Sequence, residues 1–289
     1  MNTVAMISVV LYIALAPLMG CLLAGLDRKL SARMQSRIGP PVLQPYYDVR
    51  KLIEKDDVTV NRVQDFYVAC FLMFIIITGC IFFAGGDLLL TIFALTLSNM
   101  FLVLAAFSSN SPYSQVGAER ELYQMMAYEP MVLLTMIGFY LVCGSFNVSD
   151  IVVSDKMPFI TMIGLFIGFL FILTIKFRKS PFDLSMSHHA HQDLVRGLTT
   201  EFSGKTLAMV EISHWYENIM LLGIVFLFFC NGEWWGYAIG IAVALLAFFF
   251  ETFIDNSFAR MKWQVALKSS WVVAAILGLI NVAFLIWVF

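Results

Sequence analysis

Charged side chains are scarce in this sequence. Only 13% of the 289 residues are Asp, Glu, Lys or Arg, and 60% are hydrophobic. A soluble domain of this size would carry about a quarter charged residues. The formal net charge is −2 and no basic arm is present, so nucleic acid is not an expected partner. The composition predicts a polytopic membrane protein that has the lipid bilayer as its surroundings.

Cysteines are also few, and their placement argues against a redox or metal cofactor in this chain. All five fall inside or beside apolar runs, and no two have C-x-x-C spacing: Cys21, Cys70, Cys80, Cys143 and Cys230. We therefore expect no iron–sulfur cluster and no zinc knuckle here. If the protein takes part in redox chemistry, a partner subunit carries the electrons.

The N-terminal stretch MNTVAMISVVLYIALAPLMG lacks the basic start and the A-x-A cleavage site of a signal peptide. Its apolar run is also too long for a signal sequence, so we interpret it as a retained first helix. Neither an internal repeat nor a Ser/Gly-rich linker divides the chain. We expect a single transmembrane domain over residues 1–289.

Eight apolar segments are long enough to cross a bilayer, which takes about twenty residues in a helix. They predict an all-α membrane helix bundle with spans at residues 3–26, 66–84, 88–107, 122–143, 157–175, 207–230, 234–254 and 267–288. Of the 18 Lys and Arg residues, only Lys156 falls on the other side of these spans from the rest. The positive-inside rule then makes loops 27–65 and 176–206 cytoplasmic and puts both termini outside.

Ionisable residues inside the predicted spans need an explanation, because each is costly in hydrocarbon. Glu211, His214 and Glu217 follow i, i+3, i+6 spacing and can form one polar stripe facing the bundle interior. Glu129 lies in the fourth predicted span, directly before Pro130, where the helix is bent or short of a hydrogen bond. Two interpretations stay open, an interhelical hydrogen-bond cluster and a path for protons or cations.

Other polar residues extend or accompany this stripe. Asp193 and Glu201 occupy the loop that leads into it, which favours a path from the cytoplasmic face into the membrane. Glu251 and Asp255, near the inner end of the seventh predicted span, are interpreted as an interfacial cap. His188, His189 and His191 invite a metal hypothesis, but a polar loop that docks against a partner is favoured.

Three long motifs resemble a known family. The second large loop contains R-x-x-P-F-D, an acidic residue before L-V-x-G, and T-E-F-S-G; the others are GAERELYQMMAYE at 117–129 and RIGPPVLQPYYDVRK at 37–51. Together they resemble the core membrane subunit of respiratory complex I, which docks the hydrophilic arm and shapes the quinone cavity. The resemblance covers most of the chain, and eight spans with outside termini agree with it.

The departures from complex I resemble a particular branch. The loop between Gly39-Pro40 and Gln44-Pro45 is several residues shorter, and P-F-D is followed, after Leu184, by SMSHHAHQDLVRG. His214 stands where complex I usually has a Glu. These features are similar to membrane subunits of group 4 energy-converting (Ech-type) [NiFe] hydrogenases and of formate hydrogenlyase.

The resemblance implies a membrane anchor and proton-coupling subunit in the cell membrane of a prokaryote. It implies partners that this chain would hold together: hydrogenase large and small subunits with a [NiFe] centre, an iron–sulfur subunit with [4Fe-4S] clusters, an antiporter-like membrane subunit, and ferredoxin as electron donor. By analogy, the proton path comprises Glu129, Asp193, Glu201, Glu211, His214 and Glu217. The implied docking interface for the arm comprises Arg37, Gly39, Pro40, Asp48, Lys51, Arg120, Pro181, Phe182, Asp183, His188, His189 and His191.

Three alternatives were weighed against this interpretation. One is the quinone-site membrane subunit of an NADH:quinone oxidoreductase, and another is a purely structural anchor whose buried acids only join helices. A standalone secondary transporter is disfavoured, because the sequence has no inverted repeat and its large loops suit a partner. The sequence does not distinguish H⁺ from Na⁺ as the transported ion.

Overall fold

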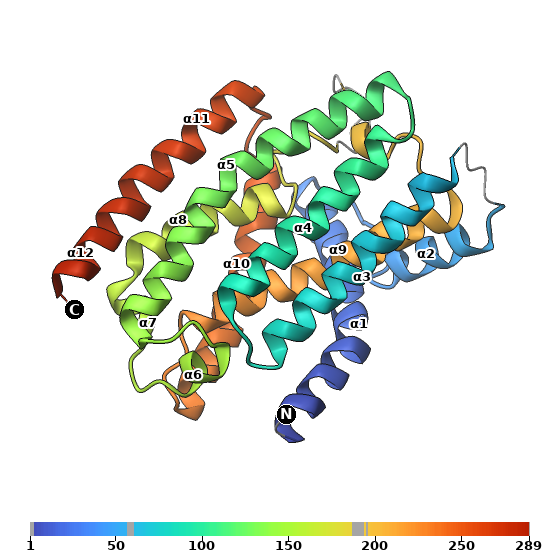
Figure 1. The fold of residues 1–289 in the computed structure, drawn as a ribbon. Coiled ribbons are helices and arrows are strands. Elements are labelled where there is room, and N and C mark those ends of the chain that lie inside the picture. Colours follow the sequence, from blue (N-terminus) through green and yellow to red (C-terminus); the bar gives the residue numbers. More distant parts are fainter. Residues whose placement is uncertain (1–2, 57–60, 187–193, 195, 289) are drawn as a thin grey trace.

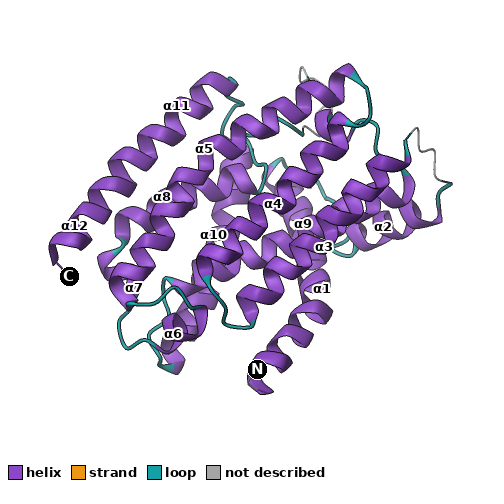
Figure 2. Cartoon of the chain, in the orientation of Figure 1, coloured by secondary structure: helices purple, strands orange, loops and turns teal. Residues whose placement is uncertain are grey.

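The computed structural model describes residues 3–56, 61–186, 194 and 196–288, and these form a bundle of helices (Figures 1 and 2). The longest helices are α1 (Thr3–Met34), α3 (Arg62–Phe83), α4 (Leu88–Phe107), α5 (Pro112–Cys143), α9 (Gly204–Leu227) and α10 (Trp234–Ser257). Shorter elements are α2 (Gln44–Glu54), α6 (Val148–Val153), α7 (Pro158–Thr161), α8 (Ile163–Lys176), η1 (Gly197–Thr199), α11 (Trp263–Val273), the π-helical turn η2 (Ala274–Leu279) and α12 (Ile280–Val288). The predicted polytopic helical membrane bundle is confirmed.

The number of membrane spans agrees only in part with the prediction of eight. Within the described residues, six helical stretches are long and apolar enough to cross a bilayer: α1, α3, α4, α5, α10 and the continuous run α11–η2–α12. The fifth predicted span is broken at Met162 into α7 and the 14-residue α8. The sixth is α9, which carries the polar stripe. The count of eight therefore stays a prediction.

Two helices extend well beyond the predicted spans. α5 begins at Pro112 rather than at residue 122, and α1 continues to Met34 rather than stopping at residue 26. Both extensions are rich in polar residues, so hydropathy ends the span where the apolar run ends. Helix formation itself continues, because a helix satisfies its own backbone groups in water as well as in lipid.

Sequential helices run back and forth between two ends of the bundle. One end holds the start of α1, the α3–α4 turn, and the segments that join α5 to α8 and α9 to α10. Its contacts are Ser8 Oγ to Phe83 O (2.7 Å), Leu88 N to Phe146 O (2.9 Å) and Phe159 N to Phe228 O (2.8 Å). The C-terminal α12 also reaches this half, since Asn281 Nδ2 donates to Thr161 O at 3.3 Å.

The opposite end, called here the basic end, gathers the loops before α3, before α5, between α8 and α9, and between α10 and α11. Its contacts are Gln35 Nε2 to Asn256 Oδ1 (3.1 Å), Asn61 Nδ2 to Ser108 O (3.2 Å) and Met261 N to Pro181 O (3.0 Å). Most of the Lys and Arg residues lie in these loops, in α2, or in the adjoining ends of the longer helices. Placement of this end in the cytoplasm, and of both termini outside, stays a prediction from the positive-inside rule.

α9 lies at the centre of the arrangement, in contact with α1, α2, α3 and α10. Its approach to α1 depends on a small residue, as is usual where membrane helices pack closely. A Cβ atom added at Gly20 would lie 2.6 Å from both Cβ and O of Trp215. The α1–α9 contact therefore needs glycine at this position, and it holds Trp215 in place beside the cavities described below.

We expect Gly20→Ala to destabilise the bundle by about 1–3 kcal/mol, because the added methyl meets the backbone of α9 and both helices must shift. The measurement is the thermal unfolding midpoint of the purified protein in detergent. Ala14→Val is the matched control, since Ala14 lies on an exposed side of the same helix. Equal midpoints for Gly20→Ala and the wild type would contradict the close packing.

Candidate functional site

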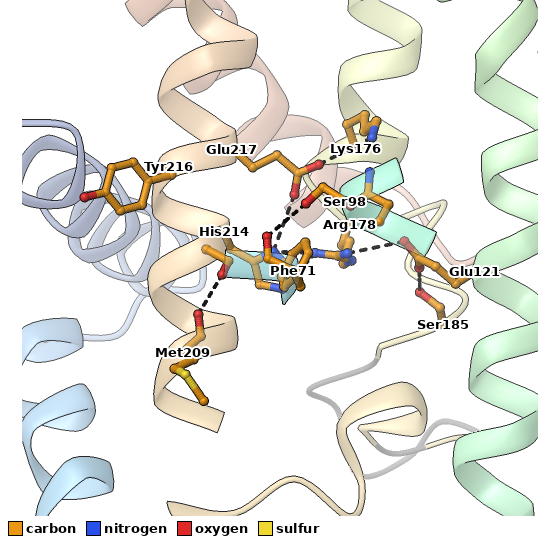
Figure 3. A network of polar contacts seen from close by, with 12 residues as sticks. Phe71, Ser98, Glu121, Lys176, Arg178, Ser185, Met209, His214, Tyr216 and Glu217 are labelled. Atoms are coloured by element: carbon orange, nitrogen blue, oxygen red, sulfur yellow. Dashed lines mark hydrogen bonds and ion pairs between the residues drawn. The ribbon is translucent and has the colours of Figure 1, made fainter. Parts of the chain in front are cut away.

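The polar stripe of α9 faces the interior, as its spacing predicts. α9 begins at Gly204, whose φ of +50° lets the preceding loop turn sharply into the helix. His214 is half-buried and Glu217 is buried. Figure 3 shows both side chains pointing away from α9 toward Arg178 and Lys176, while Glu121 approaches from α5. Two predicted site residues are thus brought together with three others.

Glu217 lies deepest in this group, with only 2% of its side chain exposed. Its Oε1 is 3.3 Å from Nζ of Lys176, the last residue of α8, and its Oε2 is 3.5 Å from Nδ1 of His214. Lys176 also lies 4.2 Å from the centre of the Tyr128 ring, a cation–π contact. A buried carboxylate is tolerated only with such partners, since burial without them costs several kcal/mol.

Arg178 connects His214 to α5. It follows α8 in a left-handed conformation (φ +52°), and its Nη1 lies 2.9 Å from both Nδ1 and Nε2 of His214. Its Nη2 is 3.3 Å from Oε1 of Glu121, whose Oε2 accepts a hydrogen bond from the Ser185 hydroxyl. A guanidinium has only donors, so the ring nitrogen that bonds to it must accept. The contact of Nδ1 with the Glu217 carboxylate needs a donor, which puts the ring proton on Nδ1 and leaves Nε2 to accept from Arg178 in a neutral imidazole.

These side chains form one continuous line of contacts, called here the buried charge network: Glu121, Arg178, His214, Glu217 and Lys176. It joins α5, the loop after α8, and α9. Two carboxylates face two cations, with a neutral imidazole between them. The network is therefore balanced when the imidazole is neutral, and a proton taken up by one ring nitrogen must be matched by a proton released from the other.

A cavity of about 460 Å³ opens beside the network at the basic end. It is lined by Lys176, Arg178 and His214 of the network, and by Glu211 and Asn218 of α9. A second cavity of about 430 Å³ lies between α2 and the start of α9. Both cavities share Arg28, Glu211 and Trp215 in their linings, so Glu211 stands between the two.

The second cavity is bounded by a charged contact between α1 and α2. Nη1 of Arg28 lies 2.5 Å from Oδ2 of Asp48, and Gln44 Nε2 donates to Oδ1 of Asp48 at 2.8 Å. Partial burial acts to raise the pKa of Asp48, but the contacts with Arg28, Gln44 and Lys51 outweigh it and lower that pKa below its usual value. The pair holds the amphipathic α2 against α1.

The remaining residues of the predicted proton path are less closely connected. Glu129 is half-buried on α5 and, with Tyr128 and Lys176, lines a small cavity of about 10 Å³, room for about one water. Glu201 is exposed before α9 and lies outside the buried charge network. Asp193 lies outside the described residues. Membership of these residues in a path stays a prediction.

The predicted docking residues other than Asp48 divide into three groups. Arg37 and Lys51 are exposed, Gly39 and Pro40 are half-buried, and Arg120 donates to Leu184 O at 3.3 Å. Three others, namely Pro181, Phe182 and Asp183, are buried by this chain itself. His188, His189 and His191 lie outside the described residues. The docking role of the set stays a prediction, and the buried three are placed to shape the loop rather than to meet a partner directly.

Sequence reasoning missed the cations of the network. It counted Lys176 and Arg178 only as loop charges and did not include Glu121 in the proton path. One clue was available, because Lys176 sits inside the apolar run FILTIKF, where a lone ammonium group needs a buried acid. Nothing in the spacing, however, says which helix supplies that acid.

The fold and the site define a class of protein: polytopic membrane proteins with a network of paired charges buried among their helices. Residues 6–286 match the family described as NADH dehydrogenase, and the chain belongs to that family. The resemblance to membrane subunits of complex I and of hydrogenases is thereby confirmed at the level of the family.

Individual relatives come from both kinds of complex. Hydrogenase-4 component C of Escherichia coli (strain K12) is 27% identical, covering 99% of this chain and 94% of the relative. A subunit of the NADH-quinone oxidoreductase of Anoxybacillus flavithermus is 30% identical, covering 89% of this chain and 85% of the relative. A chain of the membrane-bound sulfane sulfur reductase, an archaeal respiratory membrane complex, has the same fold, with a TM-score of 0.84 over 96% of this chain and 99% of that one, at 24% identity.

We expect Asp48→Asn to loosen α2, because it removes the charge that pairs with Arg28. Amide hydrogen exchange across residues 44–54 should rise severalfold at pH 7. Glu54→Gln is the control, since Glu54 pairs with Arg50 within α2 itself and not with a neighbouring helix. Equal exchange in both variants would contradict the assignment.

The same contact gives α2 a pH dependence. The pKa of Asp48 is lowered in the folded state, so its stabilising contribution is present above the unfolded value of about 3.9. That contribution is lost as the pH falls through the lower folded pKa. Wild-type α2 should therefore approach the behaviour of Asp48→Asn only in strongly acidic buffer, as measured by the same hydrogen exchange.

Proposed function

We propose that this chain is the membrane-anchor and proton-coupling subunit of a multisubunit energy-converting [NiFe] hydrogenase. It would dock a ferredoxin-oxidising, hydrogen-evolving arm at its basic end. The observation that supports this is the buried charge network, which leads from the larger cavity at that end to Glu217 and Lys176 between α8 and α9. The relationship to Hydrogenase-4 component C favours a hydrogenase as the host complex.

The network supplies the elements of a proton relay. A proton from water in the larger cavity, or from Glu211 at its wall, reaches the neutral imidazole of His214 at Nε2 when Arg178 turns aside. His214 can then release its Nδ1 proton to Glu217, 3.5 Å away. Lys176 stabilises the ionised Glu217 before the proton arrives. When Glu217 is protonated, the ammonium group of Lys176 keeps its cation–π contact with the Tyr128 ring.

Redox chemistry in the docked arm would drive this relay by changing the charge near its buried groups. Each pKa unit by which a nearby charge shifts a buried group corresponds to about 1.36 kcal/mol. Arg178 and Ser185 both belong to the loop that carries the P-F-D motif, and both contact Glu121. A displacement of that loop by a docked partner would therefore change the surroundings of Glu121 and His214 together.

The hydrogenase chemistry itself would belong to the partners. Large and small hydrogenase subunits and an iron–sulfur subunit would hold the [NiFe] centre and the [4Fe-4S] clusters, which supply electron transfer from ferredoxin and the reduction of protons. An antiporter-like membrane subunit would complete the ion path. The present chain would contribute the docking surface and the charged line that begins there.

A second candidate is the quinone-site membrane subunit of a complex I type enzyme. The two adjoining cavities favour it, because a ligand entering beside α2 could extend from one to the other past Trp215. The relationship to the NADH-quinone oxidoreductase of Anoxybacillus flavithermus supports it as well. A quinone titration of the purified complex separates the candidates, since the hydrogenase should show no quinone dependence.

For the proposed relay, Glu217→Gln should lower the ion gradient formed per hydrogen at least tenfold, because the amide keeps the shape and cannot titrate. The measurement uses the whole complex in liposomes with reduced ferredoxin, comparing hydrogen release with the gradient. Glu54→Gln is the control on the exposed surface of α2. Normal coupling in an assembled Glu217→Gln complex would refute the relay.

The double variant Glu217→Gln/Lys176→Met separates a relay from a structural anchor. Glu217→Gln alone leaves the ammonium group buried without its partner, which costs about 3–5 kcal/mol and can impair assembly. Removing both charges should restore assembly. A relay stays uncoupled in the double variant, whereas a purely structural pair would recover both assembly and coupling.

A further inference from the structure

A second set of buried charges lies on another part of the wall of the larger cavity. Nζ of Lys179 is 2.5 Å from Oδ2 of Asp27 on α1 and 3.4 Å from Oδ2 of Asp255 on α10. The Thr252 hydroxyl donates to Asp27 at 2.8 Å, and the backbone N–H of Ser180 donates to Asp255 at 2.8 Å. Lys179, Asp27 and Asp255 all line the cavity, so this cluster joins α1, α10 and the loop after α8.

Glu251 belongs to this cluster but has no hydrogen bond of its own. Its side chain lies on α10, one turn before Asp255, and the residue is 0% exposed. Neither carboxyl oxygen has a hydrogen-bond partner within the described structure. The charged groups that act on it are Lys179, from the loop after α8, and Asp255 of its own helix. Asp27 on α1 acts on the same ammonium group, since it is paired with Lys179.

The charge balance decides the state of Glu251. Lys179 is already shared by two carboxylates, and its pKa lies above the usual value, because Asp27 and Asp255 together outweigh the effect of burial. An ionised Glu251 would be a third carboxylate on a single ammonium group, without a donor and out of contact with water. Such an uncompensated buried charge is strongly unfavourable, so the carboxyl group keeps its proton.

We propose that Glu251 is a buried proton-holding site that exchanges its proton with the larger cavity when Lys179 changes partners. The exchange conserves atoms and charge. With Asp27 and Asp255 ionised, Lys179 protonated and Glu251 neutral, the cluster has a net charge of −1. When the ammonium group turns toward Glu251, the carboxyl O–H bond breaks and the proton passes to the carboxylate of Asp255, which faces the cavity. The net charge stays −1.

This site is linked to the buried charge network through the backbone. Arg178 and Lys179 are consecutive residues at the end of α8, and each neutralises acids of a different cluster. The two side chains contact acids on different helices, Arg178 on α5 and Lys179 on α1 and α10. A movement of this loop therefore changes both cation positions at once. The assignment of Glu251 does not depend on the identity of the host complex.

Infrared difference spectroscopy of the intact purified complex tests the proposal. The wild type should show a protonated carboxyl C=O band at neutral pH that is absent from Glu251→Gln and still present in Glu217→Gln and Glu54→Gln. The band should shift in D₂O during buffer exchange, because the cavity supplies the deuteron. Glu251→Gln should assemble at wild-type yield, since one neutral side chain replaces another of the same shape.

Two results would overturn the proposal. An assembled Glu251→Gln complex that keeps the full wild-type band would show that Glu251 is ionised. A band lost in Glu251→Gln but unshifted by D₂O in the wild type would show that the proton does not exchange with the cavity. If Glu251→Gln fails to assemble, the same comparison is made with Glu251→Met. A Glu251→Met complex that keeps the full wild-type band would likewise show that Glu251 is ionised. The infrared tests of Glu251 do not depend on whether Glu217→Gln loses coupling between hydrogen release and the ion gradient.

Discussion

The structure depends on pairing charges that are buried among apolar helices. Glu217 and Lys176 lie between α8 and α9 with 2% and 5% of their side chains exposed, and neither is tolerable there without the other. The same requirement brings Arg178 to Glu121 and Lys179 to Asp27. These pairs do not need to add to the stability of the fold, because apolar residues of similar size in the same places would give a protein of equal or greater stability. Their retention is better explained by a function that needs titratable groups in this place.

The sequence was informative wherever a pattern is local. The run 88–107 coincides with α4, since Asp87 accepts a hydrogen bond from Leu90 N and so marks the helix start. The i, i+3, i+6 spacing of Glu211, His214 and Glu217 correctly predicted an inward stripe, because positions on one helix fix which residues share a face.

What the sequence did not reveal is the set of residues supplied by other helices. Hydropathy treated Lys176 and Arg178 as the start of a loop, although α8 ends there in the interior and both side chains turn toward α9. Glu121 was outside the predicted fourth span, because polar residues end an apolar run without ending the helix. Glu251 was interpreted as an interfacial cap, yet its side chain is fully buried, and spacing along α10 cannot show which other elements cover it.

The two charge clusters differ in how they hold protons, because they differ in their numbers of acidic and basic groups. The buried charge network matches two carboxylates with two cations and adds a neutral imidazole, so it is balanced without a further proton. The Lys179 cluster has three carboxyl groups for one cation, so it must already hold a proton. The first cluster can therefore pass a proton on through the imidazole, whereas the second can donate one that it holds, and both face the same cavity of about 460 Å³. Because Arg178 and Lys179 are neighbours in the chain, a single loop displacement can alter both balances, which is the property that a coupling element between an arm and a membrane path requires.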